Sequence, residues 1–89
     1  MVDYNQAIKL NPNYFLPYNN RGIVKFRKGD LDGAVADYNQ AIKLNPNYAL
    51  AYRNRGNAKQ KKGDSNGAIA DFNRAIKLGP QPADVATPE

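Results

Sequence analysis

Residues 3–14 read DYNQAIKLNPNY, and residues 37–48 repeat these twelve letters without a change. Residues 71–80 bring most of them back as DFNRAIKLGP. The copies are spaced 34 residues apart, and a fixed period of this size is typical of stacked structural units. Each unit of such an array buries its apolar face only against its neighbours. We therefore expect function to lie on a repeated surface and not in one catalytic pocket.

Turn residues divide the repeat into short segments. Asn-Pro, Gly-Asp and Gly-Pro pairs fall at 11–12, 29–30, 45–46, 63–64 and 79–80. Between them apolar residues recur at intervals of three and four, which predicts a helix in each of five segments. Gly29 and Gly63 can end helices in the left-handed conformation, and the Asp after each can cap the next helix. Asn13 and Asn47 are further predicted caps.

The composition argues against catalysis. The chain has 89 residues, no Cys and no His, so it lacks disulfides, the most versatile metal ligands and the usual general base. We expect no metal site, no cofactor and no enzymatic activity. No apolar run approaches the length of a membrane span, and the N-terminus does not read as a signal peptide. These features predict a soluble, cytoplasmic protein without a membrane partner.

The repeat resembles the tetratricopeptide repeat family, whose 34-residue unit follows the pattern W-x2-L-G-x2-Y, A-x3-F and P. Tyr stands here at the family's Trp, and the other matching positions carry the family's residue or a second aromatic. The matching residues are Tyr18, Gly22, Ala34, Tyr38 and Pro46 in one unit and Tyr52, Gly56, Ala68, Phe72 and Pro80 in the next.

The resemblance implies an all-α fold in which antiparallel helix-turn-helix repeats stack into a right-handed superhelix, an α-solenoid of five helices. It divides the chain into a half repeat holding only a second helix (1–14), two full repeats (15–48 and 49–82) and a tail (83–89) that its composition predicts to be disordered. A fragment of a longer repeat protein and an engineered repeat protein would both have this layout.

Two positions depart from the family pattern in both full units. Arg21 and Arg55 replace the usual Leu, and Lys25 and Lys59 replace the usual Tyr. Each unit also carries an Asp in its second helix, so we expect the Arg21 guanidinium to pair with Asp37 or with Asp3 of the preceding unit. On this hypothesis, replacing the carboxylate alone destabilises the fold more than replacing Arg21 by Leu.

In the family, the first helix of each unit lines a concave groove. The two first helices here hold nine of the thirteen basic residues, and no Asp or Glu lies between Tyr14 and Gly29 or between Tyr48 and Gly63. Helix periodicity predicts which residues face the groove. These are Leu16, Asn19, Ile23, Phe26 and Arg27 from the first of these helices and Leu50, Arg53, Asn54, Asn57, Gln60 and Lys61 from the second.

The predicted groove suits an acidic or C-terminal peptide segment with one apolar anchor. Ile23 and Phe26 would offer an apolar stripe, while Asn54 and Asn57 would hold the peptide backbone. Family members that clamp a C-terminal carboxylate use three successive first helices, whereas this chain has two. A looser acidic-peptide groove is therefore our preferred interpretation.

Two other functions stay open. A net charge of +5 attracts phosphate whatever its sequence, so non-specific nucleic-acid binding is an alternative that we rank below peptide binding. Self-association is the other, because the first and last helices each lack one covering neighbour and expose apolar surface. End-to-end or swapped homodimers would cover both ends. The acidic tail residues Asp84 and Glu89 are a further predicted occupant of a neighbour's groove.

Overall fold

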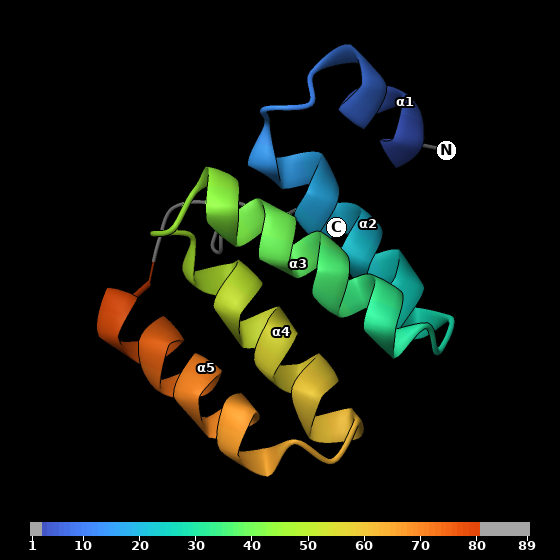
Figure 1. The fold of residues 1–89 in the computed structure, drawn as a ribbon. Coiled ribbons are helices and arrows are strands. Elements are labelled where there is room, and N and C mark those ends of the chain that lie inside the picture. Colours follow the sequence, from blue (N-terminus) through green and yellow to red (C-terminus); the bar gives the residue numbers. More distant parts are fainter. Residues whose placement is uncertain (1–2, 81–89) are drawn as a thin grey trace.

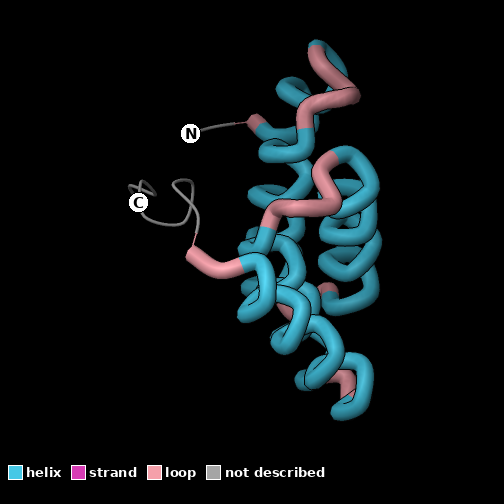
Figure 2. Tube along the Cα trace, turned by 90° about the vertical axis from the view of Figure 1, so that its left-hand side faces the viewer, coloured by secondary structure: helices cyan, strands magenta, loops and turns pink. Residues whose placement is uncertain are grey.

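The protein is described by a computed structural model in which residues 3–80 are placed (Figure 1). This part of the chain forms five helices joined by short loops, with no strand among the described residues (Figure 2). The helices are α1 (Tyr4–Leu10), α2 (Phe15–Arg27), α3 (Leu31–Leu44), α4 (Ala49–Lys61) and α5 (Ser65–Leu78). The all-α repeat fold expected from the sequence is confirmed. The predictions about residues 1–2 and about the tail at 81–89 lie outside the described residues.

The second helix of each unit begins at an Asp that caps it. The Asp30 carboxylate accepts a hydrogen bond from the Gly33 N–H at 2.9 Å, and the Asp64 carboxylate accepts one from the Gly67 N–H at the same distance. Gly29 has φ of +87°, a conformation that a side chain would strain. The Gly-Asp pairs therefore separate the helices as predicted.

The first helices begin differently from the prediction. Tyr14 and Tyr48 occupy the N-cap positions of α2 and α4, and neither caps through its side chain. Asn13 and Asn47 lie one residue too early to cap these helices. Tyr48 is instead 4% exposed and forms part of the core. A buried aromatic ring fixes the start of α4 where we had expected a polar cap.

Helices pack as antiparallel pairs within a unit and against the next unit. In Figure 1, α2 lies beside α3 and α4 beside α5, and α3 also contacts α4, while α1 contacts α2. Gly22 lets the pair close tightly, since a Cβ there would lie 2.6 Å from Cε1 of Tyr38. Gly56 has the same relation to Phe72 at 2.7 Å. The Gly of the repeat therefore seats the aromatic residue of the second helix.

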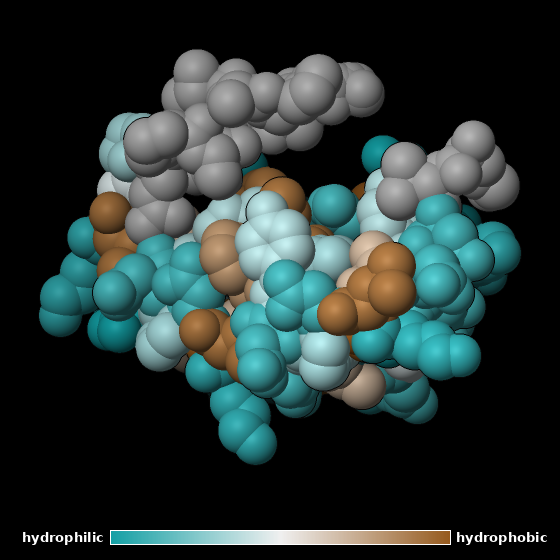
Figure 3. All heavy atoms as spheres, turned by 90° about the horizontal axis from the view of Figure 1, so that it is seen from above, coloured by the Kyte–Doolittle hydropathy of each residue, from teal (hydrophilic) through white to brown (hydrophobic). Residues whose placement is uncertain are grey.

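The buried core consists of small residues and tyrosines in two clusters. Exposed hydrophobic residues lie between hydrophilic ones on the surface seen from above (Figure 3). Burial, with the nearby Asp37 charge, raises the pKa of Tyr38 to about 12. One cluster contains Ala34, Tyr38 and Ala58, with Ile23, Phe26 and Val35 packed against it. The other contains Ala41, Tyr48 and Ala51, with Phe15, Leu16, Tyr18, Ile42 and Leu50 around it.

The cations that replace the family's apolar residues bind the repeated carboxylates. Arg21 donates through Nε and Nη2 to the two oxygens of Asp37, at 2.8 and 2.7 Å. Lys25 Nζ lies 3.2 Å from the same carboxylate, and Arg21 Nη1 donates to Asn5 Oδ1 at 2.9 Å. Of the two expected partners, Asp37 is confirmed, whereas Asp3 caps α1 by accepting from the Gln6 N–H.

The second full unit repeats this network. Arg55 forms the same paired hydrogen bonds with Asp71 and donates to Asn39 at 2.9 Å. Lys59 lies 3.2 Å from the Asp71 carboxylate. Burial raises the pKa of Asp71, but the hydrogen bonds and charges of Arg55 and Lys59 outweigh burial and lower it overall. Each arginine therefore joins both helices of its own unit to the helix before them.

Candidate functional site

Five of the predicted groove residues are exposed on α2 and α4 and form what we call the basic surface. They are Arg27, Arg53, Asn57, Gln60 and Lys61. Neither helix contains an Asp or a Glu, because all carboxylates among residues 3–80 lie outside α2 and α4.

The ion pairs decide which cations remain available on this surface. Asp37 takes Arg21 and Lys25, and Asp71 takes the equivalent pair in the next unit. Lys62 pairs with Asp32 of α3. Within the described part of the chain, Arg27, Arg53 and Lys61 have no carboxylate within ion-pair distance. These three charges are therefore available to an anionic partner.

The apolar groove residues are tied into the core. Ile23 and Phe26 pack against the cluster that contains Tyr38, and Leu16 and Leu50 pack against the cluster that contains Tyr48. All four are half-buried. The expected apolar stripe therefore lies at the edge of the hydrophobic core, and only part of each side chain is accessible to a ligand.

Asn19 is not available on the surface, contrary to the prediction. Its side chain is 0% exposed, and its Oδ1 accepts a hydrogen bond from Asn54 Nδ2 at 3.1 Å. Its own Nδ2 has no partner among the described residues. The pair joins α2 to α4, because Asn19 lies on α2 and Asn54 on α4. Asn19 therefore positions the two first helices and does not present its amide to a ligand.

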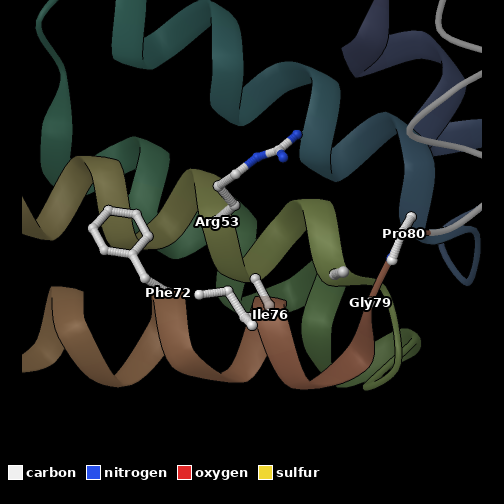
Figure 4. A pocket seen from close by; sticks show the side chains of 7 residues that line it. Arg53, Phe72, Ile76, Gly79 and Pro80 are labelled. Atoms are coloured by element: carbon white, nitrogen blue, oxygen red, sulfur yellow. The ribbon is translucent and has the colours of Figure 1, made fainter.

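Arg53 lies at the rim of a cavity that the sequence did not predict (Figure 4). In Figure 4, Phe72 and Ile76 rise from α5 toward α4, while Arg53 extends from α4 on the other side. The cavity has a volume of about 590 Å³, and its remaining lining is apolar or backbone. It is lined by Ala49, Arg53, Phe72, Ala75, Ile76, Gly79 and Pro80, and we call it the α5 cavity.

A second cavity lies where α1 meets α2. Its volume is about 410 Å³. Its lining mixes charged and polar residues with Val24. The lining residues are Asp3, Tyr4, Asn5, Arg21, Val24, Lys25 and Lys28.

Residues 3–80 contain no group of His, Cys, Asp or Glu side chains placed to hold a metal ion. Among the described helices, none has both the length and the apolar character needed to cross a membrane. The basic surface and the two cavities are therefore the features to explain.

Comparisons with known proteins agree with the geometry. A family profile described as TPR repeat matches residues 1–29 and 24–63, and one described as tetratricopeptide repeat matches residues 49–82. No curated protein gives a match.

Solved structures of similar fold were also found. One, titled as the crystal structure of MamA, has 31% sequence identity and a TM-score of 0.81 over 84% of this chain. Another is titled as YrrB, a TPR protein with an unusual peptide-binding site, and has 27% identity and a TM-score of 0.85 over 94% of this chain. The match covers 44% of the first chain and 43% of the second, so the present chain spans less than half of either.

Proposed function

The chain belongs to the tetratricopeptide repeat family, and we propose that it is a protein-interaction scaffold whose basic surface binds an acidic or C-terminal peptide segment. Family members of this kind are protein-binding modules and generally not enzymes. One structural neighbour, YrrB, is described as having an unusual peptide-binding site, which supports a peptide as the ligand class here.

The observation that carries the proposal is the sorting of charge between helices. Asp37 and Asp71 are each bound by one Arg and one Lys. Asp32 is bound by Lys62. Arg27, Arg53 and Lys61 form no ion pair within the described residues, and the exposed amides of Asn57 and Gln60 lie on the same helix as Arg53 and Lys61. Guanidinium and ammonium groups form charge-assisted hydrogen bonds with carboxylates, and side-chain amides can bond a peptide backbone.

A charge reversal tests the proposal. We expect Arg53→Glu to weaken binding of an acidic, fluorescently labelled peptide by about tenfold or more, which corresponds to roughly 1.4 kcal/mol. Fluorescence anisotropy measures this loss. Lys43→Glu is the matched control, since Lys43 is exposed on α3 and the change in net charge is identical. Equal loss in both variants would mean that only the overall charge matters, which contradicts a defined surface.

The same titration distinguishes a peptide from a nucleic acid. Phosphate binding weakens steeply between about 50 and 200 mM salt, because each contact releases condensed counterions. A peptide held partly by amides and apolar contacts loses much less affinity over this range. Tighter binding of a single-stranded RNA than of the acidic peptide, with the steep salt response, would refute the peptide proposal in favour of the nucleic-acid alternative.

A further inference from the structure

The structure contains one complete example of how a first helix docks on the preceding unit. The N-terminal half of α4 sits against α2 and α3. Tyr48 packs edge-on against Phe15, with ring centroids 4.8 Å apart, and Asn54 donates to Asn19 at 3.1 Å. Farther along, Arg55 donates to Asn39 at 2.9 Å. These three contacts define the seat of a first helix.

The α5 cavity is the same seat one period further along the chain. Subtracting 34 from its lining residues gives the residues around the start of α4. Ala49 takes the place of Phe15, Arg53 that of Asn19 and Ile76 that of Ile42. Ile42 packs against the cluster containing Tyr48, whereas Ile76 is 76% exposed. No described residue covers the α5 cavity as α4 covers its counterpart.

The rest of the α5 face has the same property. Ile69 is 56% exposed, although its counterpart Val35 packs against the cluster containing Tyr38 and Ala58. Asn73 is exposed on α5, and its counterpart Asn39 accepts a hydrogen bond from Arg55. The face therefore offers two isoleucines and an amide acceptor at the spacing that α4 meets inside the molecule.

At the other end of the array, α2 is covered by α1. None of the described residues of α1 is buried, whereas α3 and α5 each contain buried residues. A cavity opens between the two helices, with Val24, Lys25 and Lys28 of α2 among its lining residues. Of the eight residues at 71–78, six are identical to those at 3–10, so α5 carries nearly the same contact set as α1.

We propose that the α5 cavity binds α2 of a second copy of this chain, with α5 taking the place of that copy's α1. The pairing places a counterpart at each of the three seat contacts. Arg21 of the second copy would donate to Asn73 instead of Asn5, and its Asn20 would accept from Arg53. Its Tyr14, 44% exposed in this structure, would fill the space left where Ala49 replaces Phe15.

The pairing joins two different surfaces, so it is heterologous and does not close on itself as a twofold dimer does. Each added copy still presents a free α5 cavity. We therefore expect species larger than a dimer to appear as concentration rises. The cost of each addition is small, because the displaced α1 has no buried residue.

Two substitutions at the same place in the repeat test the proposal in opposite directions. Ile8 on α1 and Ile76 on α5 compete for α2. We expect Ile76→Asp to weaken self-association by at least tenfold, because it places a charge in the joint. Ile8→Asp should strengthen it several-fold, because it loosens only the competitor. Sedimentation velocity over a hundredfold concentration range measures both, and circular dichroism checks that helix content is kept.

A milder variant guards against misfolding. Asn73→Ala removes only the acceptor for Arg21 of the second copy, and it should weaken association while leaving helix content unchanged. Wild-type chain that stays monomeric over the whole range would overturn the proposal, as would Ile8→Asp and Ile76→Asp both weakening association. Peptide binding by the basic surface should be unchanged in Asn73→Ala, since Asn73 is exposed on α5 and does not line the cavity that contains Arg53, so the failure of one proposal does not decide the other.

Discussion

At the scale of single residues, the repeated arginine holds the array together. Arg21 binds the two oxygens of Asp37 and also reaches Asn5 of the preceding helix. The hydrogen bonds to Asp37 raise the pKa of Arg21 above its ordinary value, although burial opposes the shift. This pair could be predicted from the sequence, because the Asp and the Arg recur with the same period. The amide partner Asn5 was not predictable, because nothing in the spacing distinguishes it from other polar residues of α1.

Burial in the structure changes the expected effect of breaking this pair. The Asp37 side chain is 6% exposed and the Arg21 side chain 27%, so the carboxylate has less access to water when left alone. We therefore expect Arg21→Leu to cost about 1–3 kcal/mol, since Lys25 alone would remain beside Asp37. Asp37→Leu should cost less, which reverses the order expected from the sequence.

The double variant completes the test. Replacing both Arg21 and Asp37 by Leu should recover much of the loss, because no buried charge then remains. Urea denaturation of the four proteins gives the coupling free energy. Strictly additive losses would show that the pair does not act as a unit.

Asn19 illustrates what residue-level reasoning could not find. Helix periodicity placed it among the groove residues, yet it is fully buried against Asn54. From the sequence alone, a polar residue that faces a neighbouring helix cannot be distinguished from one that faces solvent. Only the position of α4 decides between these outcomes, and the position of α4 depends on the packing of the whole array.

At the scale of elements, the helices follow from turn chemistry and the joints between them from residue size. Gly-Asp pairs gave the boundaries correctly, because a left-handed Gly and an Asp cap act locally. The starts of α2 and α4 were misassigned to Asn caps, because Tyr14 and Tyr48 hold the N-cap positions, and Tyr48 is buried in the core. Local signals therefore predict the ends that the backbone determines and miss those that packing determines.

The glycine inside α2 belongs to this scale. A Cβ at Gly22 would meet the buried ring of Tyr38 at 2.6 Å, so the ring or the helix would have to move. Gly22→Ala removes a residue that costs a helix up to about 1 kcal/mol, yet we expect a net destabilisation of about 1–2 kcal/mol from overpacking.

Chemical denaturation measures this difference. Asn66→Ala, at an exposed position of α5, is the control, and it should change stability by no more than about 0.5 kcal/mol. A Gly22→Ala chain more stable than the parent would contradict the close approach of α2 and α3.

At the scale of the whole molecule, copies of one repeated unit present surfaces that differ in charge and in shape. Inside the array, the carboxylates form ion pairs with the cations nearest to them. The cations of α2 and α4 that are unpaired among residues 3–80 contribute to the basic surface. The charge asymmetry was readable from the sequence, because it needs only helix assignment and counting. The α5 cavity was not, because its shape arises from α4 and α5 together.

The most direct test of the interaction surface is residue-resolved. We would add an acidic peptide to the isotope-labelled chain, at a protein concentration below self-association, and follow the backbone amide signals by NMR. We expect the largest shifts at Arg27, Arg53, Asn57, Gln60 and Lys61 on α2 and α4. Saturable shifts confined to α3 and α5, or no shifts at peptide excess, would contradict the proposal that the basic surface is the binding site.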